Sequence, residues 1–395
     1  MMFRKVIFWG HLVAGLTAGV FIMVMAVTGV LLTYEGQIED WAKVQAVDAP
    51  EGAVVLSAED LLAANGAVAG QVLTLPREDG GLVTLAQGRS AQVLDPYSGA
   101  AVEGAGDGVS DFFHAVMSLH RWLSFSGSTE VGGWLIDASN LVFLVLVVSG
   151  IYMWLPKAWK WSMLKTRLLS RRGLPTTQAR DHNWHHVLGF WALVPLFVIV
   201  LTGVIMSYSW ANTLLFASVG EDVPVRGGPP VSAPANGLNA TGGQQALQRS
   251  ETNIPNRLER QDLGGKPLAY AVLIEKAQEV KPDWTRASIA VPEDSAGVVL
   301  VTLDSGNGQQ PGAKTRFVMD RASGEVVSAE SGATGTTGAK MRMWARFAHT
   351  GQYYGLIGQT IAGLASLAAA VLVWTGIALG YRRLARMART RRAVA

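Results

Sequence analysis

Four long apolar stretches interrupt an otherwise mixed pattern of polar and hydrophobic positions along the chain. Each stretch is nearly free of charged residues. Each is also longer than the about 20 apolar residues that a helix needs to cross a hydrocarbon core about 30 Å thick. The pattern therefore predicts four membrane-spanning helices, over residues 6–33, 134–155, 184–209 and 354–381. The first stretch is longer than the apolar region of a signal peptide and lacks a small-residue cleavage site at its end, so we expect it to be retained.

The distribution of charge predicts the orientation of these spans. Lys and Arg gather before the first stretch, between the second and third, and after the fourth, and short loops of this kind stay on the cytoplasmic side. Residues 34–133 carry 14 acidic and four basic residues instead. We therefore expect both termini to be cytoplasmic and residues 34–133 and 210–353 to face outward. The net charge of +3 reflects this topology and gives no indication of a nucleic-acid partner.

The spans repeat their pattern in two halves. Thr28–Tyr34 in the first stretch resembles Thr202–Tyr208 in the third, and Ser149–Tyr152 in the second resembles Thr375–Ala378 in the fourth. Each half contains an even number of spans, so both halves enter the membrane in the same direction. An axis along the membrane normal should relate the halves, as in other parallel repeats.

The two outward segments share a motif as well. Val93–Gly99 resembles Val318–Gly324, and each predicts a strand, a turn with Asp at its start and Gly where positive φ is needed, and a second strand. Residues 220–266 are rich in Gly, Pro, Asn and Gln, which is typical of a flexible insertion. The second half is therefore longer than the first.

The predicted fold class is an integral membrane protein with an all-α bundle of four transmembrane helices, built from two parallel repeats, and with two small α+β domains outside the membrane. Membrane lipid surrounds such a bundle. Its parts in chain order are transmembrane helix 1 (1–33), the first outer domain (34–111), an amphipathic helix and transmembrane helix 2 (112–155), a basic cytoplasmic loop (156–183), transmembrane helix 3 (184–209), the second outer domain with its insertion (210–345), transmembrane helix 4 (346–381) and a basic cytoplasmic tail (382–395).

The seven histidines avoid the bulk of the outer segments, and four of them match under the repeat. An offset of 174 residues carries His11 onto His185, and His120 corresponds to His349 when a three-residue gap is allowed. The symmetry should bring His11 opposite His185 at the cytoplasmic side, the inner pair, and His120 opposite His349 at the outer side, the outer pair. Two histidines that face each other on helices of a bundle form an axial ligand pair for haem iron.

The same offset carries Gly15 onto Gly189, and each glycine follows an inner histidine by one turn. A glycine there would let a flat macrocycle approach the backbone. The alternative is that the histidines are interface anchors or hydrogen-bonded packing residues. Arg121 and Arg346 stand close to the outer histidines in the sequence, where they could pair with haem propionates, although ordinary interfacial arginines fit the pattern too.

Three histidines have no partner under the repeat. We expect His114, His182 and His186 to support an iron ligand, to contact a haem propionate or to lie at the membrane interface rather than to bind iron. His182 and His186 are four residues apart on one helix face, so a separate metal site is an alternative for this pair. Asp137 lies one turn into the second span, and a carboxylate at that depth is either functional or close enough to the interface to stay hydrated.

Several chemistries are excluded by what the sequence lacks. With no cysteine, the chain has no disulfide, thiolate metal site or thioether-linked haem. Neither a dinucleotide fingerprint nor a P-loop is present, and the cytoplasmic segments are too short for a flavin or nicotinamide domain. Any electrons must therefore come from a separate cytoplasmic reductant or from quinol.

The motifs resemble those of the PepSY-associated transmembrane helix family. The segments that carry the resemblance are Gly10–Gly15 with Thr28 and Gly29, Leu119–Leu123, Ser149–Pro156, His185–Gly189 and Ala348–Gly351. The outer segments resemble PepSY domains, which are small units of helix and antiparallel sheet. Leu56–Asp60 would open the helix of the first, with Ser57 as its N-cap. The resemblance covers nearly the whole chain apart from 220–266.

This resemblance implies a function. The family includes ferric-siderophore reductases of the ferrioxamine type, which lie in the bacterial inner membrane and bind two haem b. It implies iron ligation by His11, His120, His185 and His349, although His186 and His114 are neighbours that could replace two of them. The hypothesis is that electrons from a cytoplasmic reductant or quinol reduce a periplasmic ferric siderophore, which releases iron as Fe(II).

Other functions fit parts of the same sequence. One alternative is a quinol-linked b-type cytochrome with a periplasmic protein acceptor. Another is a siderophore permease or docking protein without haem, against which we note that no span interior looks broken by Gly or Pro. A third is a regulatory protein that uses PepSY domains for protein contacts, with purely structural histidines.

Overall fold

The computed structural model describes residues 2–88, 90–156, 160–224, 267–293, 296–308, 310–332 and 335–394. Most of the predicted insertion at 220–266 therefore lies outside the described residues. The chain divides into two compact units. We call Met1–Glu35, Asp111–Val223 and Trp344–Ala395 the membrane unit, and Gly36–Ser110 and Pro224–Met343 the sheet unit.

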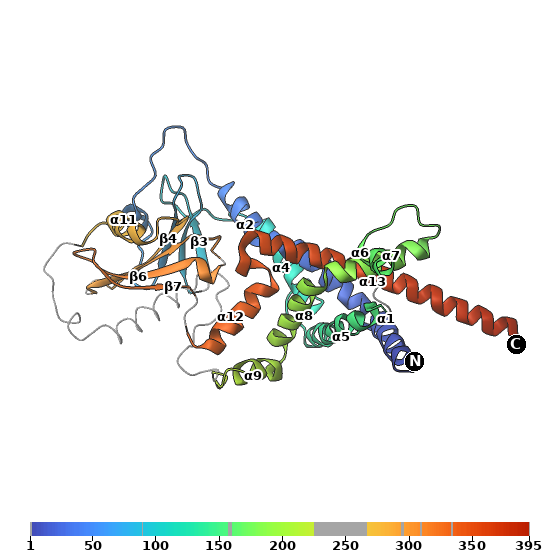
Figure 1. The fold of residues 1–395 in the computed structure, drawn as a ribbon. Helices are drawn as coiled ribbons and strands as arrows, with labels where there is room; N and C mark the ends of the chain where they lie inside the picture. The colour runs from blue at the N-terminus through green and yellow to red at the C-terminus, as the bar shows by residue number, and fades with distance from the viewer. Residues whose placement is uncertain are drawn as a thin grey trace. The chain divides into compact units, whose positions relative to one another are not determined.

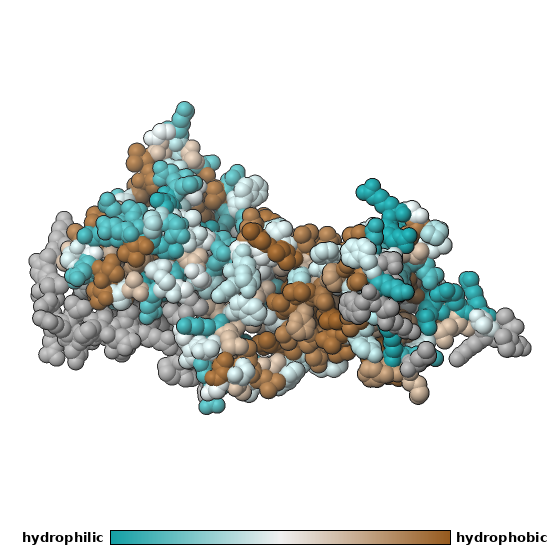
Figure 2. All heavy atoms as spheres, viewed as in Figure 1, coloured by the Kyte–Doolittle hydropathy of each residue, from teal (hydrophilic) through white to brown (hydrophobic). Residues whose placement is uncertain are grey.

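The membrane unit is helical where the structure describes it, and three helices of this described part are long and apolar enough to cross a membrane. Val6, Val13, Val20 and Val27 lie one heptad apart on α1 and are all exposed, as lipid-facing residues would be. Figure 2 shows the apolar side chains gathered over these helices. The helices in chain order are α1 (Met2–Leu31), η1 (Leu32–Tyr34), α4 (Asp107–Trp122, which begins in the sheet unit), α5 (Glu130–Trp154), α6 (Trp161–Leu168), α7 (Thr177–Trp191), α8 (Leu193–Ser207), α9 (Ser209–Ala217), α12 (Thr337–His349), η3 (Gln352–Tyr354) and α13 (Gly355–Val394).

The third predicted span is not a single helix. α7 and α8 meet at Ala192 and are bent by 70°, so the described part of the unit has three candidate spans, or four if this bent pair counts as one. Pro195 lies at the start of α8, where it has no N–H to donate to the carbonyl of Trp191 and so interrupts the helical hydrogen bonding. The expectation that no span is broken by Gly or Pro is wrong at this position.

Small residues pack the helices of the membrane unit closely. Ala26 of α1, Ala192 at the bend, and Ala365, Ala368 and Ala369 of α13 are buried in one cluster. Such residues let helix backbones approach each other, which is the main source of helix association in lipid. α1 and α13 can therefore run side by side, as Figure 1 shows.

The sheet unit contains one antiparallel sheet of seven strands in the order β3-β2-β1-β4-β5-β6-β7. α3 and α11 contribute Leu61 and Leu273 to its core, where they meet Leu73, Ile289 and Phe317, all fully buried. The elements are α2 (Glu35–Val44), α3 (Ala58–Ala64), β1 (Val72–Pro76), β2 (Val83–Gln87), β3 (Ser90–Leu94), α11 (Tyr270–Val280), β4 (Arg286–Ala290), β5 (Val298–Asp304), η2 (Pro311–Ala313), β6 (Lys314–Asp320) and β7 (Val326–Ser331).

The two segments that were predicted to face outward share this sheet instead of forming separate sheets. β1 of the first segment pairs with β4 of the second, with Leu73 opposite Ile289. Each segment supplies a helix followed by an antiparallel meander, so the halves repeat as the sequence predicts. Their pairing covers one edge of each meander, and an uncovered strand edge is prone to aggregate. The prediction of two separate α+β domains thus differs from the observed single sheet.

The local motifs form as predicted. Asp95 accepts a hydrogen bond from the Tyr97 N–H at 2.8 Å, and Asp320 accepts one from the Ala322 N–H at 2.9 Å. Gly99 and Gly324 follow with φ of 74° and 70°, a conformation that glycine adopts without strain. Ser57 is the N-cap of α3, because its hydroxyl accepts a hydrogen bond from the Asp60 N–H at 3.1 Å.

A buried carboxylate ties α7 to α13. Asp181 is only 1% exposed, and it accepts hydrogen bonds from Arg382 at 2.6 Å and Arg180 at 2.9 Å. Removing a partner from a buried ion pair costs about 3–5 kcal/mol, and since Arg180 remains we expect Arg382→Gln to cost about 2 kcal/mol. Thermal unfolding in detergent should show a lower Tm for this variant. Arg389→Gln, in the exposed end of the same helix, should leave the Tm unchanged; equal shifts would contradict a stabilising role for the Asp181 pair.

Candidate functional site

Four histidines of the membrane unit share one arrangement, in which Nδ1 lies within hydrogen-bond distance of a hydroxyl on another helix. These are the four residues that the internal repeat selects. The distances are 2.9 Å from His11 on α1 to Ser149 on α5, 3.0 Å from His185 on α7 to Thr375 on α13, 2.7 Å from His120 on α4 to Thr28 on α1, and 3.2 Å from His349 on α12 to Thr202 on α8.

The hydroxyl residues are themselves related by the repeat. Thr28 and Thr202 occupy the first position of one repeated motif, and Ser149 and Thr375 occupy the first position of the other. Each inner histidine therefore contacts the hydroxyl residue of the motif in the second or fourth predicted span. Each outer histidine contacts the hydroxyl residue of the motif in the first or third predicted span. The sequence alone did not assign these hydroxyls a role. The signal was nevertheless present, because Ser or Thr followed by Gly recurs at all four places.

The glycine after the hydroxyl faces the imidazole ring at three of the four places. A Cβ built on Gly376 would lie 3.4 Å from Cε1 of His185, one on Gly150 would lie 3.7 Å from Cε1 of His11, and one on Gly29 would lie 3.8 Å from Cε1 of His120. These are ordinary van der Waals distances, and the fourth glycine, Gly203, faces Asn140 instead. Gly15 and Gly189, the predicted glycines, face Leu146 and Leu372 instead.

His11 lies close enough to His185, and His349 close enough to His120, for their charges to interact, as His182 and His186 do with His185. That the members of each pair face each other across an iron stays a prediction. The inner pair lies close to the basic end of the unit, since the Arg383 guanidinium lies 4.5 Å from the Phe8 ring, three residues before His11. Among the described residues, none is hydrogen-bonded to Nε2 of these four histidines.

The remaining histidines occupy other positions. His182 and His186 contact each other, with 3.2 Å between their Nε2 atoms. Within the described part of the chain, no group of three or more His, Cys, Asp or Glu side chains could hold a metal ion, so this pair has no third protein ligand. His114 is exposed on α4, six residues before His120 and on a different face of the helix. The geometry therefore favours His185 over His186, and His120 over His114, as the hydroxyl-bound residues.

The charged candidates lie near aromatic rings. Arg121 stacks its guanidinium 5.0 Å from the Trp122 ring centroid, and Arg346 lies 5.7 Å from that of Phe347. Their pairing with haem propionates stays a prediction. Asp137 lies close enough to Tyr208 for their charges to interact. This places the carboxylate beside the C-terminal end of α8, toward the edge of the span.

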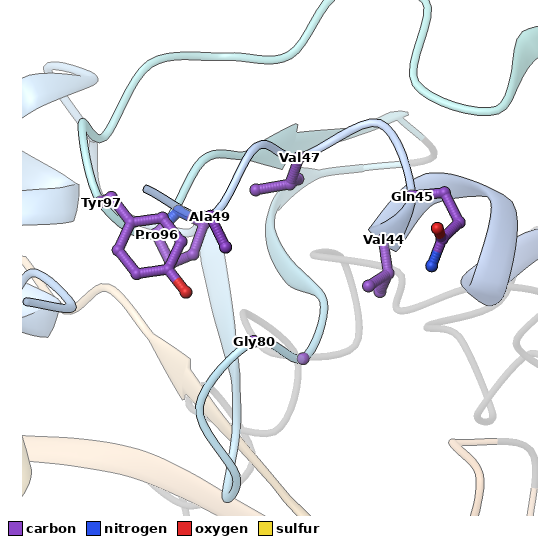
Figure 3. A pocket seen from close by; sticks show the side chains of 8 residues that line it. Val44, Gln45, Val47, Ala49, Gly80, Pro96 and Tyr97 are labelled. Atoms are coloured by element: carbon purple, nitrogen blue, oxygen red, sulfur yellow. The ribbon is translucent and has the colours of Figure 1, made fainter. Parts of the chain in front are cut away.

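A hollow in the sheet unit is separate from these residues. It has a volume of about 180 Å³, below the about 300–1,000 Å³ of pockets that bind small molecules. Figure 3 shows it between the end of α2, the loop before β2 and the turn after β3. None of the residues that line the hollow is charged. They are Val44, Gln45, Val47, Ala49, Gly80, Gly81, Pro96 and Tyr97.

A comparison with protein families identifies the family of the chain. A family model described as the PepSY-associated TM region matches residues 8–383. The matched region includes all four hydroxyl-bound histidines and all four hydroxyl residues. No curated protein matches the chain.

Proposed function

The chain belongs to the PepSY-associated TM region family, and on this basis we propose that it is a membrane oxidoreductase that binds two haem b and reduces a ferric siderophore. The observation that supports the proposal is the set of four hydroxyl-bound histidines, two at each end of the membrane unit. Purely structural histidines would not need a Ser or Thr hydroxyl that is followed by Gly at all four places.

The four imidazoles fit haem as a cofactor. Imidazole is a common axial ligand of haem iron, and a ligating histidine normally donates its other ring N–H to a nearby acceptor. His11 and His185 would hold one haem, and His120 and His349 the other. Their Nδ1 atoms already have hydroxyl neighbours, so only Nε2 is left to bind iron. Haem, when bound, supplies one-electron redox chemistry.

The overall reaction is a one-electron reduction of the chelate. One electron from a cytoplasmic reductant or from membrane quinol converts Fe(III) to Fe(II) in the siderophore. The oxygen ligands of a siderophore are hard donors that hold Fe(II) much less tightly than Fe(III), so the iron is released. No proton transfer to the chelate or covalent intermediate is required, which agrees with the absence of a nucleophilic cysteine in the sequence.

We propose a bacterial inner-membrane location with both termini in the cytoplasm. Arg382, Arg383, Arg386 and Arg389 line the last turns of α13, and basic residues flanking spans remain on the cytoplasmic side. The inner pair would then face the electron donor. The outer pair would face the periplasm, where the ferric siderophore arrives.

A siderophore permease is the second candidate, and the bend between α7 and α8 favours it. Transporters bind substrates at broken helices near the middle of the membrane. The bend at Ala192 provides such a break, which was not predicted from the sequence. A permease, however, gives no reason for the repeated histidine–hydroxyl pairs.

One absorption experiment separates these functions. Protein purified from cells supplied with iron and a porphyrin precursor should show a Soret band, and dithionite should produce the α-band of reduced haem b. A ferric hydroxamate siderophore should then reoxidise the reduced protein. The matched control is the Ga(III) complex of the same siderophore, which has the same charge and shape but does not accept an electron.

The outcomes distinguish the alternatives. Colourless protein would exclude both electron-transfer functions and leave the permease and the regulatory protein. A haem spectrum that ferric chelates do not reoxidise would indicate a cytochrome with a protein acceptor.

A further inference from the structure

We propose that Thr28, Ser149, Thr202 and Thr375 are positioning residues that fix the tautomer and ring orientation of the four histidines, so that every Nε2 presents its lone pair. The proposal that this lone pair binds iron rests on the proposed function. The tautomer itself is a property of the protein chain and can be measured without haem.

The hydrogen bonds of the hydroxyl groups decide the tautomer. A Ser or Thr hydroxyl has one proton to donate and two lone pairs that accept. In all four cases the hydroxyl is within donating distance of the carbonyl four residues earlier on its own helix. These distances are 2.6 Å from Thr28 to Val24, 2.7 Å from Ser149 to Val145, 2.7 Å from Thr202 to Val198 and 2.8 Å from Thr375 to Val371. With the proton donated there, the hydroxyl accepts from the histidine, and Nδ1 must carry a hydrogen.

A backbone carbonyl supports the same tautomer of His349 independently. His349 Nδ1 lies 2.8 Å from the carbonyl oxygen of Ile199, which can only accept a hydrogen bond. Ile199 is three positions before Thr202, and the backbone groups that interact with His120 and His185 belong to Met25 and Leu372, at the same position relative to Thr28 and Thr375. The Nδ1–H of His349 therefore has two acceptors on one helical turn, and a neutral imidazole with hydrogen on Nδ1 has none on Nε2.

The hydrogen bond from the histidine Nδ1–H to the hydroxyl oxygen also affects the properties of a bound metal. Hydrogen bonding from Nδ1–H to an acceptor raises the basicity of Nε2, and removing such a partner typically lowers metal affinity by about 10–100-fold. A more basic ligand stabilises the more positive Fe(III). Loss of the hydroxyl should therefore weaken haem binding and raise the midpoint potential of the affected haem.

The first test is NMR of the full chain purified without haem and labelled with 15N-histidine. Each resonance is assigned by replacing one histidine at a time. The four histidines should show a protonated Nδ1 and an unprotonated Nε2, and Thr28→Val should shift the tautomer equilibrium of His120 alone. A hydrogen on Nε2 of these histidines in the unsubstituted protein would overturn the proposal.

The second test uses the haem-loaded protein and a matched control on the same helix. Thr28→Val should weaken haem retention by about 10–100-fold and raise the potential of the outer haem, while Thr28→Ser should restore both. Thr17→Val is the control, since the Thr17 hydroxyl bonds the Val13 carbonyl at 3.0 Å on α1 in the same way but contacts no histidine. Identical potentials in Thr28→Val and Thr17→Val would contradict the proposal.

The two tests also separate this proposal from the proposed function. If the protein carries no haem but its four histidines hold hydrogen on Nδ1, the redox function fails and the positioning role of the hydroxyls stands. If haem is present and the tautomer is the opposite one, the function stands and the positioning role fails.

Discussion

Replacing His185 by alanine should remove one haem from the purified protein and leave the other in place. His185 is held by Thr375 at 3.0 Å and lies near His11, so its loss leaves the iron of the inner pair with one axial ligand. The neighbouring His186 should not take over, because it points to another side of α7 and its Nε2 lies 3.2 Å from that of His182. Haem per protein, measured as the pyridine complex, should fall by half.

Double substitutions sharpen this test because residues that share one iron cannot act independently. His11→Ala combined with His185→Ala should lose no more haem than either alone. His11→Ala combined with His120→Ala should lose both haems, since these residues belong to different pairs. The controls His114→Ala and His186→Ala should retain full haem content. Unchanged haem in all four single variants of the paired histidines would contradict the ligand assignment.

The matching histidines could be identified from the sequence because a duplication leaves a nearly constant offset between equivalent residues within each repeated segment. The offset requires no knowledge of the three-dimensional contacts, and it carries His11 onto His185 directly. The hydroxyl partners required such knowledge. Ser149 is 138 residues from His11, while Thr375 is 190 residues from His185, so the separation within a contact is not the same in the two halves.

Local turns were predictable for a different reason. The turn at Asp95 and the cap at Ser57 are each formed by residues that are within five positions of one another in the chain. Both motifs can therefore be recognised directly from the sequence. The β1–β4 pairing joins Leu73 to Ile289 across more than half of the chain. A strand with alternating burial has the same sequence whether its edge is free or paired. The sequence therefore could not distinguish two sheets from one.

The bend in the third span has a similar explanation. Proline is well tolerated in the first turn of a helix, where its missing N–H has no partner within the helix. Pro195 in a continuous apolar stretch is therefore compatible with a kinked helix or with a new helix that begins at Leu193. The structure shows the second arrangement. Since a broken span is also a feature of transporters, the redox function needs a test that depends on the histidine pairs themselves.

The decisive test is to examine each end of the protein separately. His349→Ala or His120→Ala should abolish reoxidation of the dithionite-reduced protein by a ferric hydroxamate siderophore, because the haem nearest the chelate is lost. His11→Ala or His185→Ala should spare that reaction but abolish reduction by the physiological donor. The reason is structural: the inner pair lies near Arg382 and Arg383 at the basic end of the unit, whereas Thr28 and Thr202 hold the outer pair.

This comparison requires stopped-flow measurements on both sets of variants with the same chelate, with its Ga(III) complex as the inert control. Detergent-solubilised protein makes both ends accessible, so a difference between the two sets cannot arise from access across a membrane. A permease or a docking protein gives no reason for the two sets to differ in electron transfer. If His349→Ala is reoxidised as fast as the unsubstituted protein, the chelate does not react at the outer pair, and the proposed direction of electron flow is wrong.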